Sequence, residues 1–156
     1  MNFNYNLPVN LLFGRGRSAE IGTEVAKYGK KVLIVTGRSS TKKSGLLDKT
    51  ISLLDEAKVK YEVFDKVEQN PLTTTVYEGV EVIKETGCDV ILGLGGGSIM
   101  DAAKSIAFAA KNSGDISEYI FGIKQGNDAL PIVLVTTTCG TGSEGNCFSC
   151  IFWTFC

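Results

Sequence analysis

Apolar residues follow two patterns along this chain: short unbroken runs, and longer stretches in which they recur every three or four positions. The unbroken runs are typical of parallel strands buried on both faces. Strands are predicted at 31–37, 61–65, 90–94 and 131–135. The three-to-four spacing predicts helices at about 19–28, 45–58, 73–86 and 98–111.

Capping signals suggest where some of these elements begin and end. Ser18 and Thr73 are predicted N-caps, because a hydroxyl before a helix accepts a hydrogen bond from its first turn. Gly29 and Gly87 are predicted to end the helices that precede them. The start of the chain predicts a short antiparallel hairpin around Pro8.

Strands alternate with helices four times, which predicts right-handed crossovers and a doubly wound, mostly parallel α/β sheet. We therefore expect one Rossmann-like domain over residues 1–144. Loops rich in Gly, Ser and Thr follow the strands at 37–40, 95–98 and 136–144. They fall at the same carboxyl edge of the predicted sheet, where open α/β sheets bind their ligands. Their convergence indicates a binding site.

The glycine turn at 95–98 is the strongest indication of a ligand. It leads into a predicted helix, whose first amides are unpaired and carry the positive end of the helix dipole. Glycines let the backbone approach a phosphate, and Ser98 adds a hydroxyl. The spacing matches neither a P-loop nor the G-x-G-x-x-G fingerprint. A diphosphate site is the functional interpretation, and a tight turn that binds nothing is the alternative.

Composition narrows the function further. Sixteen basic and seventeen acidic residues give a net charge of −1, which does not favour a nucleic-acid partner. No apolar run is long enough for a membrane span, and the first residues lack signal-peptide features, so the expected location is the cytoplasm. The sequence contains no histidine, the commonest metal ligand and general base.

Several motifs together resemble one family. They are Phe13-Gly14-Arg15-Gly16, Val35-Thr36-Gly37, Asn70-Pro71, the segment 95–104 (GGGSIMDAAK) and the segment 137–144 (TTCGTGSE). This set is similar to the iron-containing, or group III, alcohol dehydrogenases, whose relatives include glycerol dehydrogenase and dehydroquinate synthase. The resemblance implies an N-terminal α/β domain, of the dehydroquinate-synthase type, that binds NAD(H) or NADP(H). It also implies a helical C-terminal domain that holds iron or zinc.

The resemblance also assigns residues to the cofactor. Gly96, Gly97 and Ser98 would cradle the pyrophosphate. The rest of the groove would be lined by Asn70, Thr137, Thr138 and Thr141. Asp101 would lie near the nicotinamide.

The loop after the first strand bears on the choice of cofactor. NAD preference usually needs a carboxylate that accepts from the ribose 2′-OH, and NADP preference needs donors there. NAD-preferring relatives resemble this chain but have an aspartate where it has Gly37. The loop offers Gly37, Arg38, Ser39, Ser40, Lys42 and Lys43. NADP is therefore favoured over NAD, and a solvated surface loop is the alternative.

After Glu144 the resemblance to the family stops. Residues 145–156 contain three cysteines and several aromatic residues, and a frameshift or a premature end is the favoured explanation. The alternative is a zinc site formed by Cys147, Cys150 and Cys156, although a second C-x-x-C pair is missing. We expect residues 145–156 to form no domain.

The resemblance implies reversible oxidation of a small alcohol to an aldehyde or ketone, with hydride passing to the nicotinamide. In complete relatives an aspartate and histidines of the helical domain bind the metal. Without that domain, we expect a cofactor-binding fragment that is inactive alone and prone to self-association. The alternatives are a stand-alone nucleotide-binding module without catalysis and, less favoured, a lyase related to dehydroquinate synthase.

Overall fold

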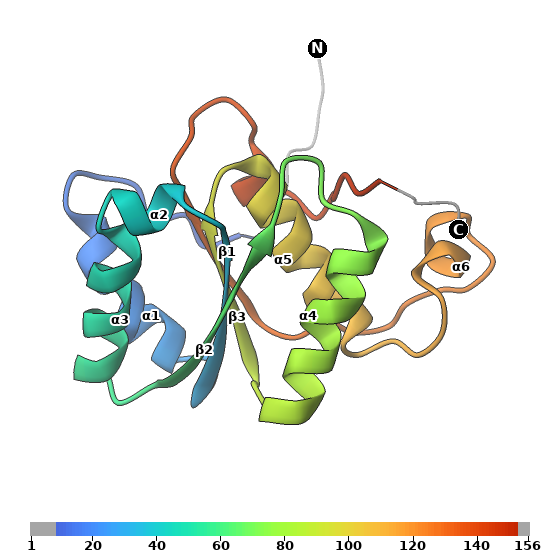
Figure 1. Cartoon of the computed structure of the whole chain (residues 1–156), viewed down its shortest axis with the longest axis horizontal. Helices are drawn as coiled ribbons and strands as arrows, with labels where there is room; N and C mark the ends of the chain where they lie inside the picture. The colour runs from blue at the N-terminus through green and yellow to red at the C-terminus, as the bar shows by residue number, and fades with distance from the viewer. Residues whose placement is uncertain (1–8, 153–156) are drawn as a thin grey trace, which may run out of the picture.

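A parallel sheet forms the centre of the protein, whose computed structural model describes residues 9–152 (Figure 1). Its strands are β1 (Lys31–Gly37), β2 (Lys60–Val67), β3 (Val90–Gly95) and β4 (Ile132–Thr136). Their spatial order is β2-β1-β3-β4, and every neighbouring pair is parallel. The predicted α/β class and the parallel sheet are confirmed.

Helices lie on both faces of this sheet. They are α1 (Ile21–Ala26), α2 (Ser40–Lys43), α3 (Leu46–Glu56), α4 (Thr73–Thr86), α5 (Gly97–Ala109) and α6 (Ile116–Ile120). Two 3₁₀ turns, Arg17–Glu20 and Ser143–Gly145, complete the described elements. Figure 1 shows α1, α2 and α3 on one side of the sheet and α4 and α5 on the other, which is the doubly wound arrangement predicted. None of the helices between residues 9 and 152 is long and apolar enough to cross a membrane.

The core has two layers because successive side chains of a strand point to opposite faces. In β1, Leu33 and Val35 join the layer under α4 and α5, whereas Val32 and Ile34 join the layer under α1 and α3. All four side chains are fully buried. Burial on both faces explains why β1 and β3 are unbroken apolar runs in the sequence.

Helix starts differ from the prediction at two places. Ser18 lies inside the first 3₁₀ turn and caps no helix, because the chain turns at Gly16 with φ 83° and enters that turn first. Thr73 is the first residue of α4 rather than its N-cap, which is Leu72. The amide of Thr73 donates to the carbonyl of Phe152 at 3.1 Å, so the main chain supplies the acceptor.

The hairpin predicted around Pro8 is partly untested. Residues 1–8 lie outside the described part of the chain. Residues 9–13 are described and form no strand. The remaining boundaries agree to within a few residues, and α4 spans the predicted range 73–86.

Asp89 joins the loop after α1 to the start of β3. Its two carboxylate oxygens each accept from the Lys30 amide at 3.0 Å, and Oδ1 also accepts from the Lys31 amide at 2.9 Å. A Cβ at Gly29 would lie 2.3 Å from Oδ1, so glycine permits this approach. Burial raises the pKa of Asp89, but the amide hydrogen bonds from Lys31 and Lys30 outweigh it and hold the pKa below its ordinary value.

We expect Asp89→Ala to lower the free energy of unfolding at neutral pH by about 2 kcal/mol, because two amides lose a charged acceptor. The folded-state pKa is depressed, so the contribution of Asp89 is fully present above the unfolded-state value of about 3.9. It is lost as the pH falls through the lower folded-state pKa. Urea titrations of wild type and variant at neutral and acid pH measure this, with the exposed Asp55→Ala as the control. A difference that stays constant down to acid pH would contradict it.

Candidate functional site

The candidate site lies where the four parallel strands end. Strands β1 and β3 are neighbours, and β4 follows β3, so the loops after Gly37, Gly95 and Thr136 open on one edge. Strand β2 ends at Val67, which pairs with Gly37, and brings the loop with Asn70 to the same edge. The predicted convergence of the loops 37–40, 95–98 and 136–144 is therefore what the topology produces.

The turn between β3 and α5 leaves the first amides of α5 without a side-chain cap. The amides of Ile99 and Met100 both donate to the carbonyl of Gly96, at 3.0 and 3.1 Å. The N-cap, Gly96, supplies no side-chain cap, so the amides of Gly97 and Ser98 have no partner within the helix. These amides fit a diphosphate, because they combine unpaired donors with the positive end of a helix of 13 residues.

Close packing explains why this turn is built from glycine. A Cβ at Gly95 would lie 2.5 Å from Cγ1 of Ile99, so the strand cannot carry a side chain there. A Cβ at Gly97 would lie 3.0 Å from the methyl carbon of Thr141, and one at Gly96 would lie 3.2 Å from Oγ1 of Thr138. The glycine turn at 95–98 and the loop 137–142 after β4, here called the threonine loop, therefore face one another.

The threonine loop is exposed from Thr137 to Gly142. Its start is fixed by the amide of Thr137, which donates to the carbonyl of Gly95 at 2.9 Å. Further along, Gly140 and Gly142 have φ values of 99° and 65°, a left-handed backbone that glycine adopts without strain. The hydroxyls of Thr138 and Thr141 thus lie beside the glycine turn, on a loop that contains no helix or strand.

Asn70 reaches the same turn from the loop after β2. Its amide donates to Oγ of Ser98 at 3.4 Å. Its φ of 57° lies outside the right-handed helical region, but in the left-handed region rather than in the extended region that a following proline favours. Asn70 and Ser98, which are 28 positions apart in sequence, are brought together at the mouth of the site.

The loop after β1 carries two charged side chains that pair with residues at the end of β2 or just after it. Arg38 forms an ion pair of 2.6 Å with Glu68, and both side chains are exposed. Lys42 pairs with Asp65, and this hydrogen bond holds the pKa of Asp65 below its usual value. Ser39 is the N-cap of α2 but makes no side-chain cap. Sequence reasoning missed Glu68, because nothing local links it to a residue 30 positions earlier in the chain.

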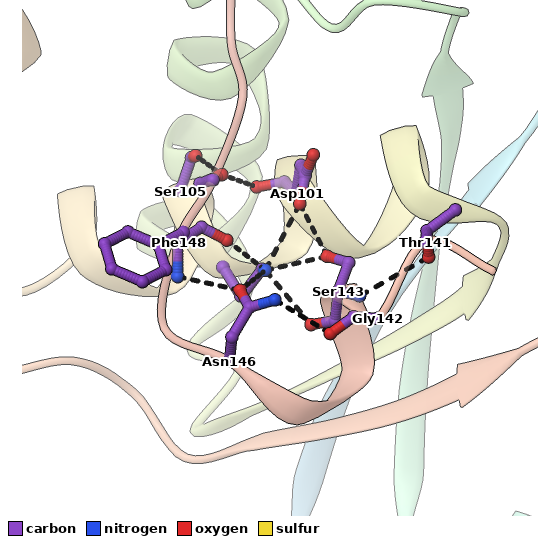
Figure 2. A network of polar contacts seen from close by, with 9 residues as sticks. Asp101, Ser105, Thr141, Gly142, Ser143, Asn146 and Phe148 are labelled. Atoms are coloured by element: carbon purple, nitrogen blue, oxygen red, sulfur yellow. Dashed lines mark hydrogen bonds and ion pairs between the residues drawn. The ribbon is translucent and has the colours of Figure 1, made fainter.

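Asp101 is engaged within the protein. Its Oδ1 accepts from Oγ of Ser143 at 2.6 Å and pairs with Nζ of Lys104 at 3.2 Å (Figure 2). The side chain is turned toward Ser143, and the main-chain carbonyl accepts from the hydroxyl of Ser149. Its placement beside a nicotinamide stays a prediction.

Sequence reasoning gave Lys104 and Ser143 no role. The available signal was a lysine in the mostly apolar helical stretch 99–110, whose other charged residue is Asp101. Close by, Oε2 of Glu144 is buried and has no hydrogen-bond partner among the described residues. It is an acceptor that a bound molecule could satisfy.

The described residues do not fit a metal. No group of three or more His, Cys, Asp or Glu side chains between residues 9 and 152 is arranged to hold one. Cys147 and Cys150 are exposed and free, and Cys156 lies outside the described range, so the zinc alternative rests on no assembled site.

Comparison with known proteins accounts for this geometry. The family model for iron-containing alcohol dehydrogenase matches residues 8–154. The chain belongs to the iron-containing alcohol dehydrogenase family. The match extends past Glu144, where the motif resemblance ends, and the domain boundary at that residue stays a prediction.

Individual relatives agree with the family assignment. The chain is 43% identical over 150 residues to a probable NADH-dependent butanol dehydrogenase 1 of Bacillus subtilis, covering 96% of this chain and 39% of the relative. It is 39% identical over 144 residues to NADH-dependent butanol dehydrogenase B of Clostridium acetobutylicum, covering 92% and 37%. The chain thus spans about two fifths of the length of these curated relatives.

A solved structure confirms the fold. An archaeal halo-thermophilic Red Sea brine pool alcohol dehydrogenase superposes with a TM-score of 0.87 at 39% identity. The match covers 98% of this chain and 41% of that structure. The Rossmann-like domain predicted from the sequence is therefore the family's α/β domain.

Proposed function

We propose that this chain is the NADP(H)-binding part of a metal-dependent alcohol dehydrogenase that interconverts a small alcohol and an aldehyde or ketone. The observation that carries the proposal is the uncapped glycine start of α5, which faces Thr138 and Thr141 at the carboxyl edge of the sheet. Unpaired amides there would accept the diphosphate, and the threonine hydroxyls would line the groove beside it. When bound, the nicotinamide would take up hydride from the alcohol carbon.

The preference for NADP follows from the end of β1. Gly37 places no carboxylate where a ribose 2′-OH would need an acceptor, and Arg38 stands next to it. Both side chains of the Arg38–Glu68 ion pair are exposed, so breaking the pair costs about 1 kcal/mol or less. A 2′-phosphate would repay this cost through a charge-assisted contact with the guanidinium. Two of the relatives have names that say NADH-dependent. If the cofactor of this chain were NAD, Glu68 would be the carboxylate at this edge that accepts from the 2′-OH.

Isothermal titration of the purified chain with NADP⁺ and with NAD⁺ tests the proposal. We expect NADP⁺ to bind more tightly, and Arg38→Ala to weaken NADP⁺ about tenfold with little change for NAD⁺. Glu68→Gln frees Arg38 and is expected to strengthen NADP⁺ binding. If Glu68→Gln weakens the binding of NAD⁺ instead, Glu68 accepts a hydrogen bond from the ribose 2′-OH and the cofactor is NAD. Failure of a folded chain to bind either nucleotide would refute the function.

The second candidate is a nucleotide-binding module without catalysis of its own. The observation that favours it is the lack of a metal-ligating group among residues 9–152, together with the absence of histidine from the sequence. We infer that this chain binds the dinucleotide without oxidising alcohols. An assay of NADPH formation from butanol with added Fe²⁺ or Zn²⁺ tests this, and measurable turnover would contradict it.

A further inference from the structure

Lys104 is a buried lysine in the middle of α5. Its exposed fraction is 8%. The ammonium donates to Oγ of Ser143 at 2.7 Å, the carbonyl of Ser143 at 3.1 Å and Oδ1 of Asn146 at 3.3 Å. It also contacts the carbonyl of Phe148 and pairs with Asp101 at 3.2 Å (Figure 2). A buried cation is costly unless it is paired and surrounded by acceptors, and here the acceptors are present.

The partners of the ammonium come from two parts of the chain. Asp101 lies one turn earlier on α5, whereas every other oxygen belongs to the segment 143–148. That segment has one short 3₁₀ turn and is otherwise irregular. Lys104 is thus a point at which this irregular segment is tied to the helix. Two hydroxyls add further ties to Asp101: that of Ser143 donates to Oδ1 at 2.6 Å, and that of Ser149 donates to the carbonyl at 2.6 Å.

The same segment contacts the loop that carries Thr141, a residue of the proposed nucleotide site. The amide of Ser143 donates to Oγ1 of Thr141 at 3.4 Å, and Nδ2 of Asn146 donates to the carbonyl of Gly142 at 2.8 Å. Thr141 in turn faces Gly97 at the start of α5. With left-handed glycines at 140 and 142, the loop has no regular structure to hold Thr141, so its position depends on the anchor that follows it.

We propose that Lys104 is a positioning residue for the dinucleotide. It touches no part of the site at Gly97, and acts by fixing Ser143 and Asn146, which hold the loop so that Thr141 lies opposite the glycine turn. This role rests on the proposed function, because it concerns affinity for the nucleotide. A loop released from Lys104 would have to be ordered when the nucleotide binds, and that ordering weakens the affinity.

The test compares NADP⁺ affinity with local order. Lys104→Met keeps the length of the side chain but removes the charge. Asn146→Ala removes the Oδ1 acceptor of the ammonium and the Nδ2 donor to Gly142 at an exposed position. We expect the dissociation constant for NADP⁺ to rise about tenfold in Lys104→Met and about threefold in Asn146→Ala. Hydrogen exchange without nucleotide is expected to speed up in residues 141–149 and to stay unchanged in β1 and β3. Lys104→Arg, which restores the charge, should recover part of the affinity.

Leu54→Val is the matched control, because Leu54 is fully buried under the opposite face of the sheet. It should lower the melting temperature while leaving the dissociation constant unchanged. If Leu54→Val weakens NADP⁺ as much as the other variants do, affinity follows global stability and the positioning role is refuted. Wild-type affinity in both Lys104→Met and Asn146→Ala would also refute it. A wild-type chain that binds no nucleotide would overturn the proposed function itself, whatever the exchange data show.

Discussion

Replacing Gly97 with aspartate is expected to weaken the binding of NADP⁺ and of NAD⁺ by about 100-fold or more. The new side chain would begin 3.0 Å from the methyl carbon of Thr141, and so would narrow the space between the turn and the threonine loop. Its carboxylate would lie at the N-terminus of α5, where the diphosphate is proposed to bind. Like charges at that point repel, and the carboxylate would also compete for the free amides.

The same variant separates loss of binding from loss of folding. A carboxylate in the first turn of a helix is favourable to the helix dipole, so Gly97→Asp should melt close to wild type. Isothermal titration gives the affinity, and thermal unfolding followed by circular dichroism gives the stability. Ser52→Asp adds the same charge at an exposed position on α3 and should bind NADP⁺ as wild type does. Unchanged affinity in Gly97→Asp would show that the diphosphate does not bind at this turn.

The sequence contained the signals for the sheet because burial there is two-sided. Strand β1 and the core of β3 could be delimited from unbroken apolar runs, and parallel pairing then placed the loops after Gly37, Gly95 and Thr136 on one edge. Helix α4 could also be predicted from the sequence, because its buried residues repeat at helical spacing and Gly87 ends it in the left-handed conformation. In each case the deciding information lies within a few residues of the element.

Contacts between distant segments could not be read in this way. The start of α4 depends on a main-chain bond to Phe152, and the partner of Arg38 is supplied by the end of β2. The hydrogen bonds of Lys104 join positions about 40 apart in the sequence. Their acceptors include main-chain carbonyls, which no pattern of side chains can predict. Two residues of the segment after Glu144, Asn146 and Phe148, supply acceptors to Lys104. Which side chains support a site is set by tertiary packing.

Replacing Gly37 with aspartate is expected to reverse the cofactor preference. A Cβ at this position would lie 3.5 Å from Cδ1 of Ile99 and 3.6 Å from the carbonyl of Val67, which are ordinary contacts. The side chain is therefore accommodated at the end of β1. Its carboxylate would accept from the 2′-OH of NAD⁺ and repel the 2′-phosphate of NADP⁺.

A charged hydrogen bond gained by one cofactor and a repulsion imposed on the other should change the ratio of the two dissociation constants by about 100-fold. Titration of Gly37→Asp with both nucleotides measures this ratio. Gly37→Asn is the control of equal size without charge, and should weaken NADP⁺ only slightly. The comparison isolates the sign of the charge at the end of β1, because both side chains fill the same space. An unchanged ratio would mean that the 2′ position of the adenosine ribose lies elsewhere, and the NADP assignment would lose its basis while the diphosphate site at Gly97 would stand.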